Sequence, residues 1–185
     1  MAEHKTTIFE TKVLAEIIIF ASLSAGLYTL TLPFLTLPFG GSVTAGSMVP
    51  IFWLSLRRGS KVGIIGGIIF SLAALMIDIV RLPNSPIAAN PASILFDYVI
   101  AFGVLGIAGL FKKYPLAGIT IASILKFFSL FISGIVFWAI YTPEGLLPII
   151  VYSAIYNGSF MTAETIISLV LMYFILKYKY LRIYM

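Results

Sequence analysis

The chain has 185 residues, of which 61% are hydrophobic and only 10% are charged. The mean hydropathy is +1.09, and a soluble domain of this size could not hide so many apolar residues from water. These values exclude a soluble globular protein. The formal net charge of +5 does not indicate a nucleic-acid partner, because the basic residues fall in short clusters between apolar stretches. Since apolar residues continue along nearly the whole length, the sequence predicts one membrane-embedded, all-α domain over residues 1–185.

Six apolar stretches are candidates for membrane spans, since a hydrocarbon core of roughly 30 Å needs about 20 apolar residues per helix. In chain order they cover residues 13–32, 43–56, 62–80, 91–111, 116–141 and 147–176. The first follows a polar start and lacks a small-residue cleavage site, so we expect it to be retained rather than removed as a signal peptide. The second is short.

The segment between the first two spans repeats a Leu-Pro-Phe unit within residues 31–41. A continuous helix is excluded there, because each proline lacks an amide donor and its ring clashes with the preceding turn. We expect this segment to form a loop or lid at the outer face of the membrane.

With the N-terminus placed in the cytoplasm, nearly all basic residues fall on the inner side of the membrane. The inner segments then hold Lys5, Lys12, Arg57, Arg58, Lys61, Lys112, Lys113, Lys177, Lys179 and Arg182. Only Arg81 falls in an outer loop, and this asymmetry follows the positive-inside rule. We therefore expect six transmembrane helices with both termini cytoplasmic.

Asp97 is the most informative single residue, because it lies within the apolar fourth span. A charge at the centre of a membrane helix costs on the order of 2.5–3.5 kcal/mol, so it needs a partner, a water-filled cavity or a ligand. Of these three we favour a ligand.

Further polar and aromatic side chains fall at the same outer level as Asp97 on three spans. They are Tyr98 on the fourth span, Trp138 and Tyr141 on the fifth, and Tyr152, Tyr156 and Asn157 on the sixth. A carboxylate, an amide, phenols and an indole suit a small, flat, cationic or amine-bearing ligand. The alternative is that the tyrosines and tryptophan form an interfacial belt, which is common in membrane proteins.

The remaining charges inside the spans favour structural roles. Lys126 and Glu164 fall at similar depth and could form a buried ion pair, or the lysine could reach towards the inner interface. Asp78 and Arg81 are three residues apart on one helix, which predicts an interfacial pair rather than a site. Two groups of glycines predict close helix packing: Gly59, Gly63, Gly66 and Gly67, and then Gly103, Gly106 and Gly109.

Several classes of enzyme lack the residues they need. The chain has no cysteine, its only histidine is His4 in the polar N-terminal tail, and it has no Gly-x-x-x-x-Gly-Lys-Ser/Thr run. We therefore expect no enzyme activity, no metal site and no cofactor. Energy for any transport must come from a partner or a gradient.

Several segments resemble the substrate-binding S-components of energy-coupling factor (ECF) vitamin transporters, specifically the thiamine-binding type. The resemblance is carried by residues 51–59, 105–111, 125–128, 131–138, 152–153 and 157–158, in an order that fits six spans. It implies a six-helix protein of the prokaryotic plasma membrane that captures thiamine from outside.

The resemblance also implies which residues form the thiamine pocket: Asp97, Tyr98, Trp138, Tyr152 and Asn157. Asp97 stands where the family has a longer glutamate, and Leu130 stands where it has a histidine. Phe34 or Phe39 replaces a tryptophan that the first outer loop supplies in the family, and we favour Phe39 as a ligand contact.

The implied partners are a transmembrane coupling subunit, two ATPase subunits and membrane lipid. An Ala-x-x-x-Ala pair, Ala21 and Ala25, is expected to contact the coupling subunit. The implied mechanism is toppling of the loaded protein in the membrane, with the outer loops as the gate. Two alternatives stay open: an S-component for a thiamine precursor, a thiamine analogue or another vitamin, which Leu130 keeps possible, and a non-transporting membrane scaffold.

Overall fold

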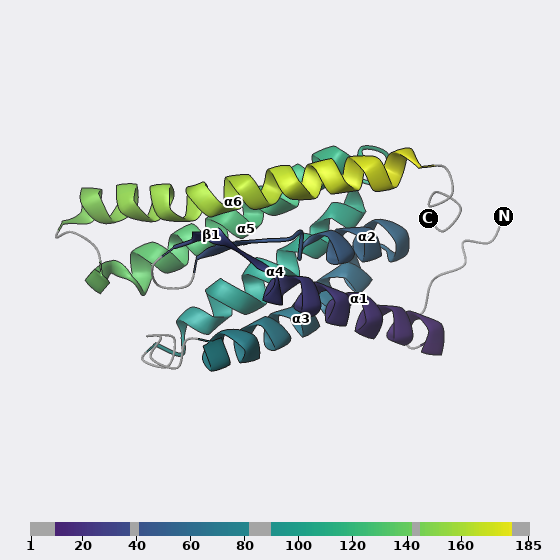
Figure 1. Cartoon of the computed structure of the whole chain (residues 1–185), viewed down its shortest axis with the longest axis horizontal. Coiled ribbons are helices and arrows are strands. Elements are labelled where there is room, and N and C mark those ends of the chain that lie inside the picture. Colours follow the sequence, from purple (N-terminus) through teal and green to yellow (C-terminus); the bar gives the residue numbers. More distant parts are fainter. Residues whose placement is uncertain (1–9, 38–40, 82–89, 142–144, 179–185) are drawn as a thin grey trace.

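The protein was analysed as a computed structural model, which describes residues 10–37, 41–81, 90–141 and 145–178 (Figure 1). Its long helices are α1 (Thr11–Thr29), α3 (Ser60–Arg81), α5 (Pro115–Val136) and α6 (Leu146–Lys177). These four are long and apolar enough to cross a membrane. Their positions confirm the first, third, fifth and sixth predicted spans.

The second predicted span is a short buried helix. Helix α2 (Val49–Arg58) has ten residues and a length of about 15 Å, half of a hydrocarbon core. All of its residues before Arg57 are buried against other helices. The predicted span began at Val43, but Val43 and Thr44 belong to a strand, so the helix starts later than the hydropathy suggested.

The fourth predicted span is a shorter apolar helix, Leu95–Leu110, of mixed geometry. A π-helical turn, η3 (Leu95–Ile100), continues into α4 (Ala101–Gly103) and then into a 3₁₀ segment, η4 (Val104–Leu110). Wide π-helical turns occur mostly as single turns within helices, frequently at functional sites. Asp97 lies in this turn.

The helices form two groups that lie along each other (Figure 1). Helices α5 and α6 run side by side over most of the length of the molecule, and α1 packs against α3 on the other side. Helix α2 and the η4 segment fill the space between them and contact α3. The first turn of α1 and the last turn of α6 lie at the same end of the molecule, as expected if both termini face one side of the membrane.

Glycines allow the main chain of α3 to touch the main chains of α4 and η4. A methyl group added to Gly106 would overlap the main chain of Ile64, and one added to Gly67 would overlap the carbonyl of Phe102. This contact confirms that these glycines serve helix packing.

Replacing Gly106 with alanine is therefore expected to destabilise the protein by about 1–3 kcal/mol, because the two backbones would have to move apart. Thermal unfolding of the purified protein measures the effect. Gly26→Ala is the matched control, since nothing lies within 4 Å of the added methyl group on α1. Equal melting temperatures for the two variants would contradict this account of the crossing.

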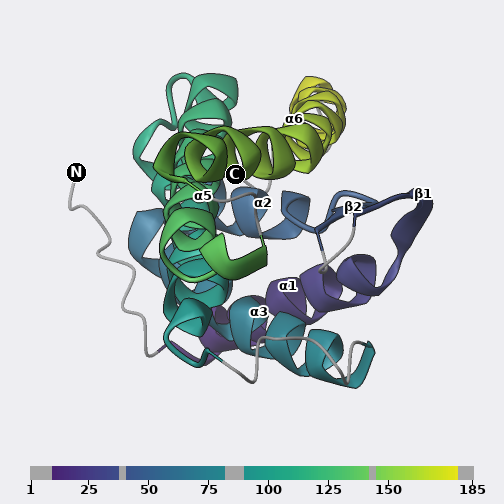
Figure 2. The same ribbon diagram turned by 90° about the vertical axis from the view of Figure 1, so that its left-hand side faces the viewer.

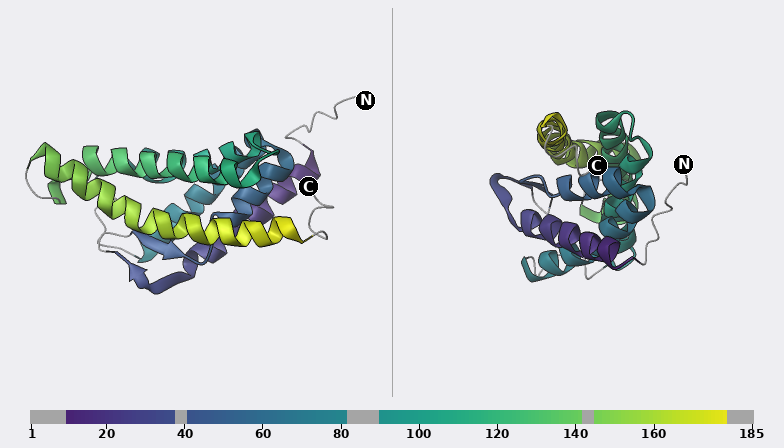
Figure 3. Two further views of the ribbon diagram at one scale, coloured as in Figure 1. Left: turned by 90° about the horizontal axis from the view of Figure 1, so that it is seen from above. Right: turned by 90° about the vertical axis from the view of Figure 1, so that its right-hand side faces the viewer.

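The segment after α1 forms a small antiparallel hairpin of β1 (Thr31–Thr36) and β2 (Ser42–Thr44). The prediction of a non-helical connection is confirmed. In the two end views the hairpin lies at the edge of the bundle between α6 and α1 (Figures 2 and 3), and β2 contacts both helices.

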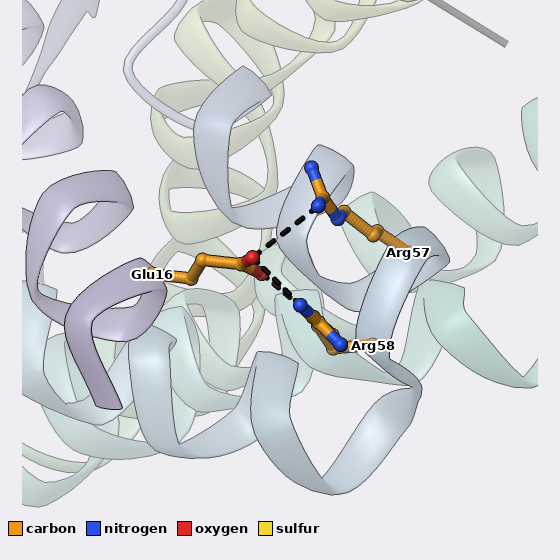
Figure 4. Close-up of polar contacts among 3 residues, drawn as sticks. All are labelled: Glu16, Arg57 and Arg58. Atoms are coloured by element: carbon orange, nitrogen blue, oxygen red, sulfur yellow. Dashed lines mark hydrogen bonds and ion pairs between the residues drawn. The ribbon is translucent and has the colours of Figure 1, made fainter. Parts of the chain in front are cut away.

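An ion cluster joins α1 to α2 near the end of the molecule where α1 begins (Figure 4). The carboxylate of Glu16 accepts from Nε and Nη2 of Arg58, each at 2.7 Å, and lies 3.3 Å from Nη2 of Arg57. One carboxylate thus holds both guanidinium groups at the turn between α2 and α3.

The Ala-x-x-x-Ala pair on α1 faces inward in this structure. Ala21 is 2% exposed and belongs to the core, and Ala25 is partly buried against it. The exposed apolar side of α1 is instead formed by Leu14, Ile18, Ile19 and Leu23. The partner contact predicted for Ala21 and Ala25 stays a prediction, and for Ala21 it requires α1 to move.

Candidate ligand-binding site

Asp97 is held against the end of α5. One carboxylate oxygen, Oδ2, accepts the indole N–H of Trp138 at 3.0 Å. Trp138 lies two residues after Val136, the last residue of α5, and directly before a short turn, η5 (Ala139–Tyr141). The structure thus brings together two predicted site residues that are 41 positions apart in the chain.

Two buried serines lie beside the same carboxylate. The hydroxyls of Ser133 and Ser93 are close enough to interact with the carboxylate of Asp97. Neither hydroxyl forms a hydrogen bond of standard geometry within the described part of the chain. The carboxylate of Asp97 therefore sits among groups that can donate to it, without a cation bound to it among the described side chains.

The π-helical turn is also anchored to α5 through its main chain. The hydroxyl of Ser129 donates to the carbonyl oxygen of Phe96 at 2.6 Å. A wide turn leaves main-chain carbonyls that need other partners, and Ser129 supplies one directly beside Asp97.

Tyr98 points to a carboxylate other than its neighbour Asp97. Its hydroxyl donates to Oδ2 of Asp78 on α3 at 2.8 Å, and the hydroxyl of Tyr28 on α1 donates to the same oxygen at 2.6 Å. Tyr98 is only 6% exposed. A ligand can therefore reach no more than an edge of this residue.

The predicted pair of Asp78 and Arg81 is replaced by contacts to other elements. Arg81 donates to the main-chain carbonyls of Tyr28 and Thr29 at the end of α1. Within the described residues Asp78 and Arg81 interact electrostatically but form no ion pair within 4 Å.

Asn157 lies on the side of α6 that packs against α5. Its Nδ2 donates to the carbonyl of Ser153 at 3.0 Å, and it lies 3.4 Å from the carbonyl of Leu130. Helices α5 and α6 can approach closely here because residue 134 is a glycine; a methyl group at this position would overlap Ser153. With the amide nitrogen directed to the helices, the carbonyl oxygen of Asn157 is the group suited to a ligand donor.

Aromatic rings line α6 beside the hairpin. The ring of Tyr152 stacks on Tyr156 at 5.9 Å between centroids, and Tyr156 contacts Phe160 edge-on at 6.1 Å. The hydroxyl oxygen of Tyr156 accepts the main-chain N–H of Gly41 at 2.9 Å and interacts electrostatically with Asp97. Tyr156 thus links the hairpin segment to the site, and Phe39 lies outside the described residues.

Lys126 and Glu164 are both buried, but the predicted ion pair is not among those of the described residues. The ammonium group of Lys126 lies 4.3 Å from the ring centroid of Phe102 and 3.5 Å from the sulfur of Met48. The carboxylate of Glu164 accepts the N–H and the hydroxyl of Thr44, each at 2.5 Å. The two residues interact electrostatically, but their direct contacts are with different neighbours.

Glu164 therefore fixes strand β2 onto α6, and Glu164→Gln is expected to loosen the hairpin. A hydrogen bond to a charged group contributes about 1.5–3 kcal/mol, roughly twice the value for a neutral acceptor. Hydrogen–deuterium exchange should be faster at the amide of Thr44 in the variant. Glu10→Gln, at an exposed position, is the control; unchanged exchange at Thr44 would show that the carboxylate does not hold the strand.

The chemistry of these groups suits a cation beside an aromatic face. Asp97 supplies the negative charge, Trp138 and the ladder of Tyr152 and Tyr156 supply aromatic surfaces, and Asn157 supplies an acceptor. Sequence reasoning assigned Asp78 to a pair with Arg81 and did not single out Tyr28. Only the fold reveals that the hydroxyls of Tyr28 and Tyr98 both donate to Asp78.

Comparison with known proteins identifies relatives over most of the chain. The model of the thiamine transporter protein family matches residues 14–185. Thiamine transporter ThiT of Bacillus subtilis strain 168 is 32% identical over 150 residues, which cover 72% of this chain and 74% of the relative. Thiamine transporter ThiT of Lacticaseibacillus paracasei is 32% identical over 139 residues, which cover 66% of this chain and 67% of the relative.

A solved structure shares the fold. The structure of ThiT from Listeria monocytogenes superposes with a TM-score of 0.74 at 20% identity, covering 91% of this chain and 94% of the other. Taken with the four apolar helices, these matches show that the chain is a multi-pass protein of the bacterial cell membrane. The relatives are named as transporters, which are not enzymes. The chain therefore belongs to the thiamine transporter protein family.

Proposed function

We propose that this chain binds thiamine at the site around Asp97 and serves as the substrate-binding S-component of an ECF transporter. The observation that carries the proposal is the carboxylate of Asp97, which lies in a membrane-embedded helix beside the indole of Trp138. A negative charge in such a place is costly unless a positive charge compensates it. The thiazolium ring of thiamine is a permanent cation.

The other groups at the site match the second half of thiamine. Its aminopyrimidine ring offers N–H donors, which the carbonyl oxygen of Asn157 or a carboxylate oxygen can accept. Its flat rings suit the faces of Trp138, Tyr152 and Tyr156. Without ligand, the indole N–H of Trp138 provides partial compensation for the charge of Asp97.

Mass spectrometry of small molecules released from the purified, denatured protein tests this function directly. The protein should release thiamine, or should bind added thiamine and melt at a higher temperature with it, since a ligand of the native state stabilises that state. Absence of both results in a folded preparation would reject thiamine as the ligand.

Leu130 supports one alternative, a ligand related to thiamine but not identical to it. Its side chain is apolar, whereas the thiamine-binding S-components that the chain resembles have a histidine at this position. A pocket that lacks this hydrogen-bonding group could favour a thiamine precursor or analogue. Binding of thiamine should therefore be compared with binding of its separate pyrimidine and thiazolium halves. Tighter binding of the pyrimidine half than of thiamine would favour the alternative.

Transport in this proposal needs a coupling subunit and two ATPase subunits, with the termini cytoplasmic and the hairpin at the outer face. The exposed apolar side of α1, next to Ala25, supports α1 as the helix that meets the coupling subunit. The scaffold alternative predicts no thiamine uptake by cells that express the chain together with such subunits.

A further inference from the structure

Asp78 forms a partly buried contact that the proposed function does not use. Its Oδ2 atom accepts two phenolic hydroxyls, from Tyr28 at 2.6 Å and from Tyr98 at 2.8 Å. These residues come from α1, α3 and the π-helical turn, so one carboxylate oxygen joins three elements. The charged and titratable groups that interact with it are Tyr28, Tyr98 and Arg81.

Tyr98 is the residue directly after Asp97, and the two side chains are held by different parts of the fold. Asp97 bonds to Trp138 at the end of α5, whereas Tyr98 bonds to Asp78 on α3. Because the two residues share a peptide unit, the contact of Tyr98 with Asp78 also restricts where the carboxylate of Asp97 can point.

The π-helical turn is therefore held from both sides. Ser129 on α5 holds the carbonyl of Phe96, the residue before Asp97, and Asp78 on α3 holds the side chain of Tyr98, the residue after it. A site that must meet a ligand within a fraction of an ångström needs such supporting contacts.

We infer that Asp78 is a positioning residue for the ligand site: by binding the hydroxyl of Tyr98 it holds the π-helical turn in the geometry that directs Asp97 to Trp138. This inference rests on the proposed function only for its effect on thiamine affinity. A purely structural role, in which Asp78 joins α1 to α3, is separable because Arg81 makes the other contact between the ends of these helices.

Nuclear magnetic resonance of the full chain labelled with ¹⁵N-tryptophan tests the inference without any ligand. The chain has two tryptophans, so the indole N–H of Trp138 reports its bond to Asp97, and that of Trp53, buried in α2, serves as an internal standard. Asp97→Asn sets the change expected when the carboxylate is lost.

Asp78→Ala and Tyr98→Phe should both shift the Trp138 indole signal towards its position in Asp97→Asn, and the double variant should shift it no further than the larger single change. Arg81→Gln is the control and should leave the signal in place. Tyr98→Phe removes only a hydroxyl, so it tests the same bond if Asp78→Ala does not fold.

Thiamine affinity gives a second readout, with a loss of about tenfold expected in Asp78→Ala and none in Arg81→Gln. If the wild type does not bind thiamine, the proposed function is rejected. A shifted Trp138 indole signal in the Asp78 and Tyr98 variants would still support the positioning role. An unmoved Trp138 signal in folded Tyr98→Phe, or independent additive shifts in the double variant, would overturn the inference.

Discussion

Asp97→Asn should weaken thiamine binding by at least about 100-fold, which corresponds to about 2.7 kcal/mol. The substitution keeps the shape of the side chain, removes its charge and turns one acceptor oxygen into an amide donor. The expected loss arises because the thiazolium cation loses its counter-charge in a site where water screens little. Isothermal titration calorimetry of the purified protein with thiamine gives the affinity.

Glu16→Gln provides a matched control for the loss of a partly buried carboxylate. It leaves Arg57 and Arg58 without their negatively charged partner, so the melting temperature should fall while thiamine affinity stays the same. If Asp97→Asn folds normally and binds thiamine within about twofold of the wild type, the carboxylate does not hold the ligand.

Trp138→Ala is expected to have the second largest effect, with affinity again reduced by about 100-fold or more. The substitution removes the aromatic face beside the cation and also the indole N–H that orients Asp97. Trp138→Phe keeps an aromatic face without the N–H donor, so its loss should be smaller, about tenfold.

The same calorimetric titration measures both variants, and Trp53→Phe controls for the loss of a tryptophan elsewhere. Trp53 is 8% exposed within α2 and should affect stability more than binding. Equal affinity of Trp138→Ala and wild type would support the view that Trp138 is merely part of an interfacial belt.

The long spans could be predicted from hydropathy, because each consists of about 20 consecutive apolar residues with polar ends. Helix α2 could not be delimited in this way. Its residues before Arg57 are mostly apolar and continue the apolar stretch that begins at Val43, but Val43 belongs to strand β2 of the hairpin and Pro50 lies in the first turn of the helix. Hydropathy does not distinguish a helix buried in protein from one in lipid.

The pairing of Asp97 with Trp138 agrees with the predicted convergence of polar groups at the outer level. The partner of Asp78 was not predictable from spacing, which suggested Arg81 on the same helix. The actual partners, Tyr28 and Tyr98, lie 50 and 20 residues away and meet Asp78 only after α1, α3 and η3 pack together.

Depth along a helix likewise did not determine the contacts of Lys126 and Glu164. Counting residues placed both at the same level, but the direction of each side chain depends on helix rotation, which the sequence does not specify. In the fold Lys126 faces Phe102 and Glu164 faces Thr44.

The central claim is that Asp97 neutralises the positive charge of bound thiamine. The most direct test compares thiamine with its thiophene isostere, which has the same shape but no charge, on the wild type and on Asp97→Asn. The claim predicts that Asp97→Asn weakens thiamine at least about 30-fold more than it weakens the neutral isostere. Equal losses for the two ligands would contradict it.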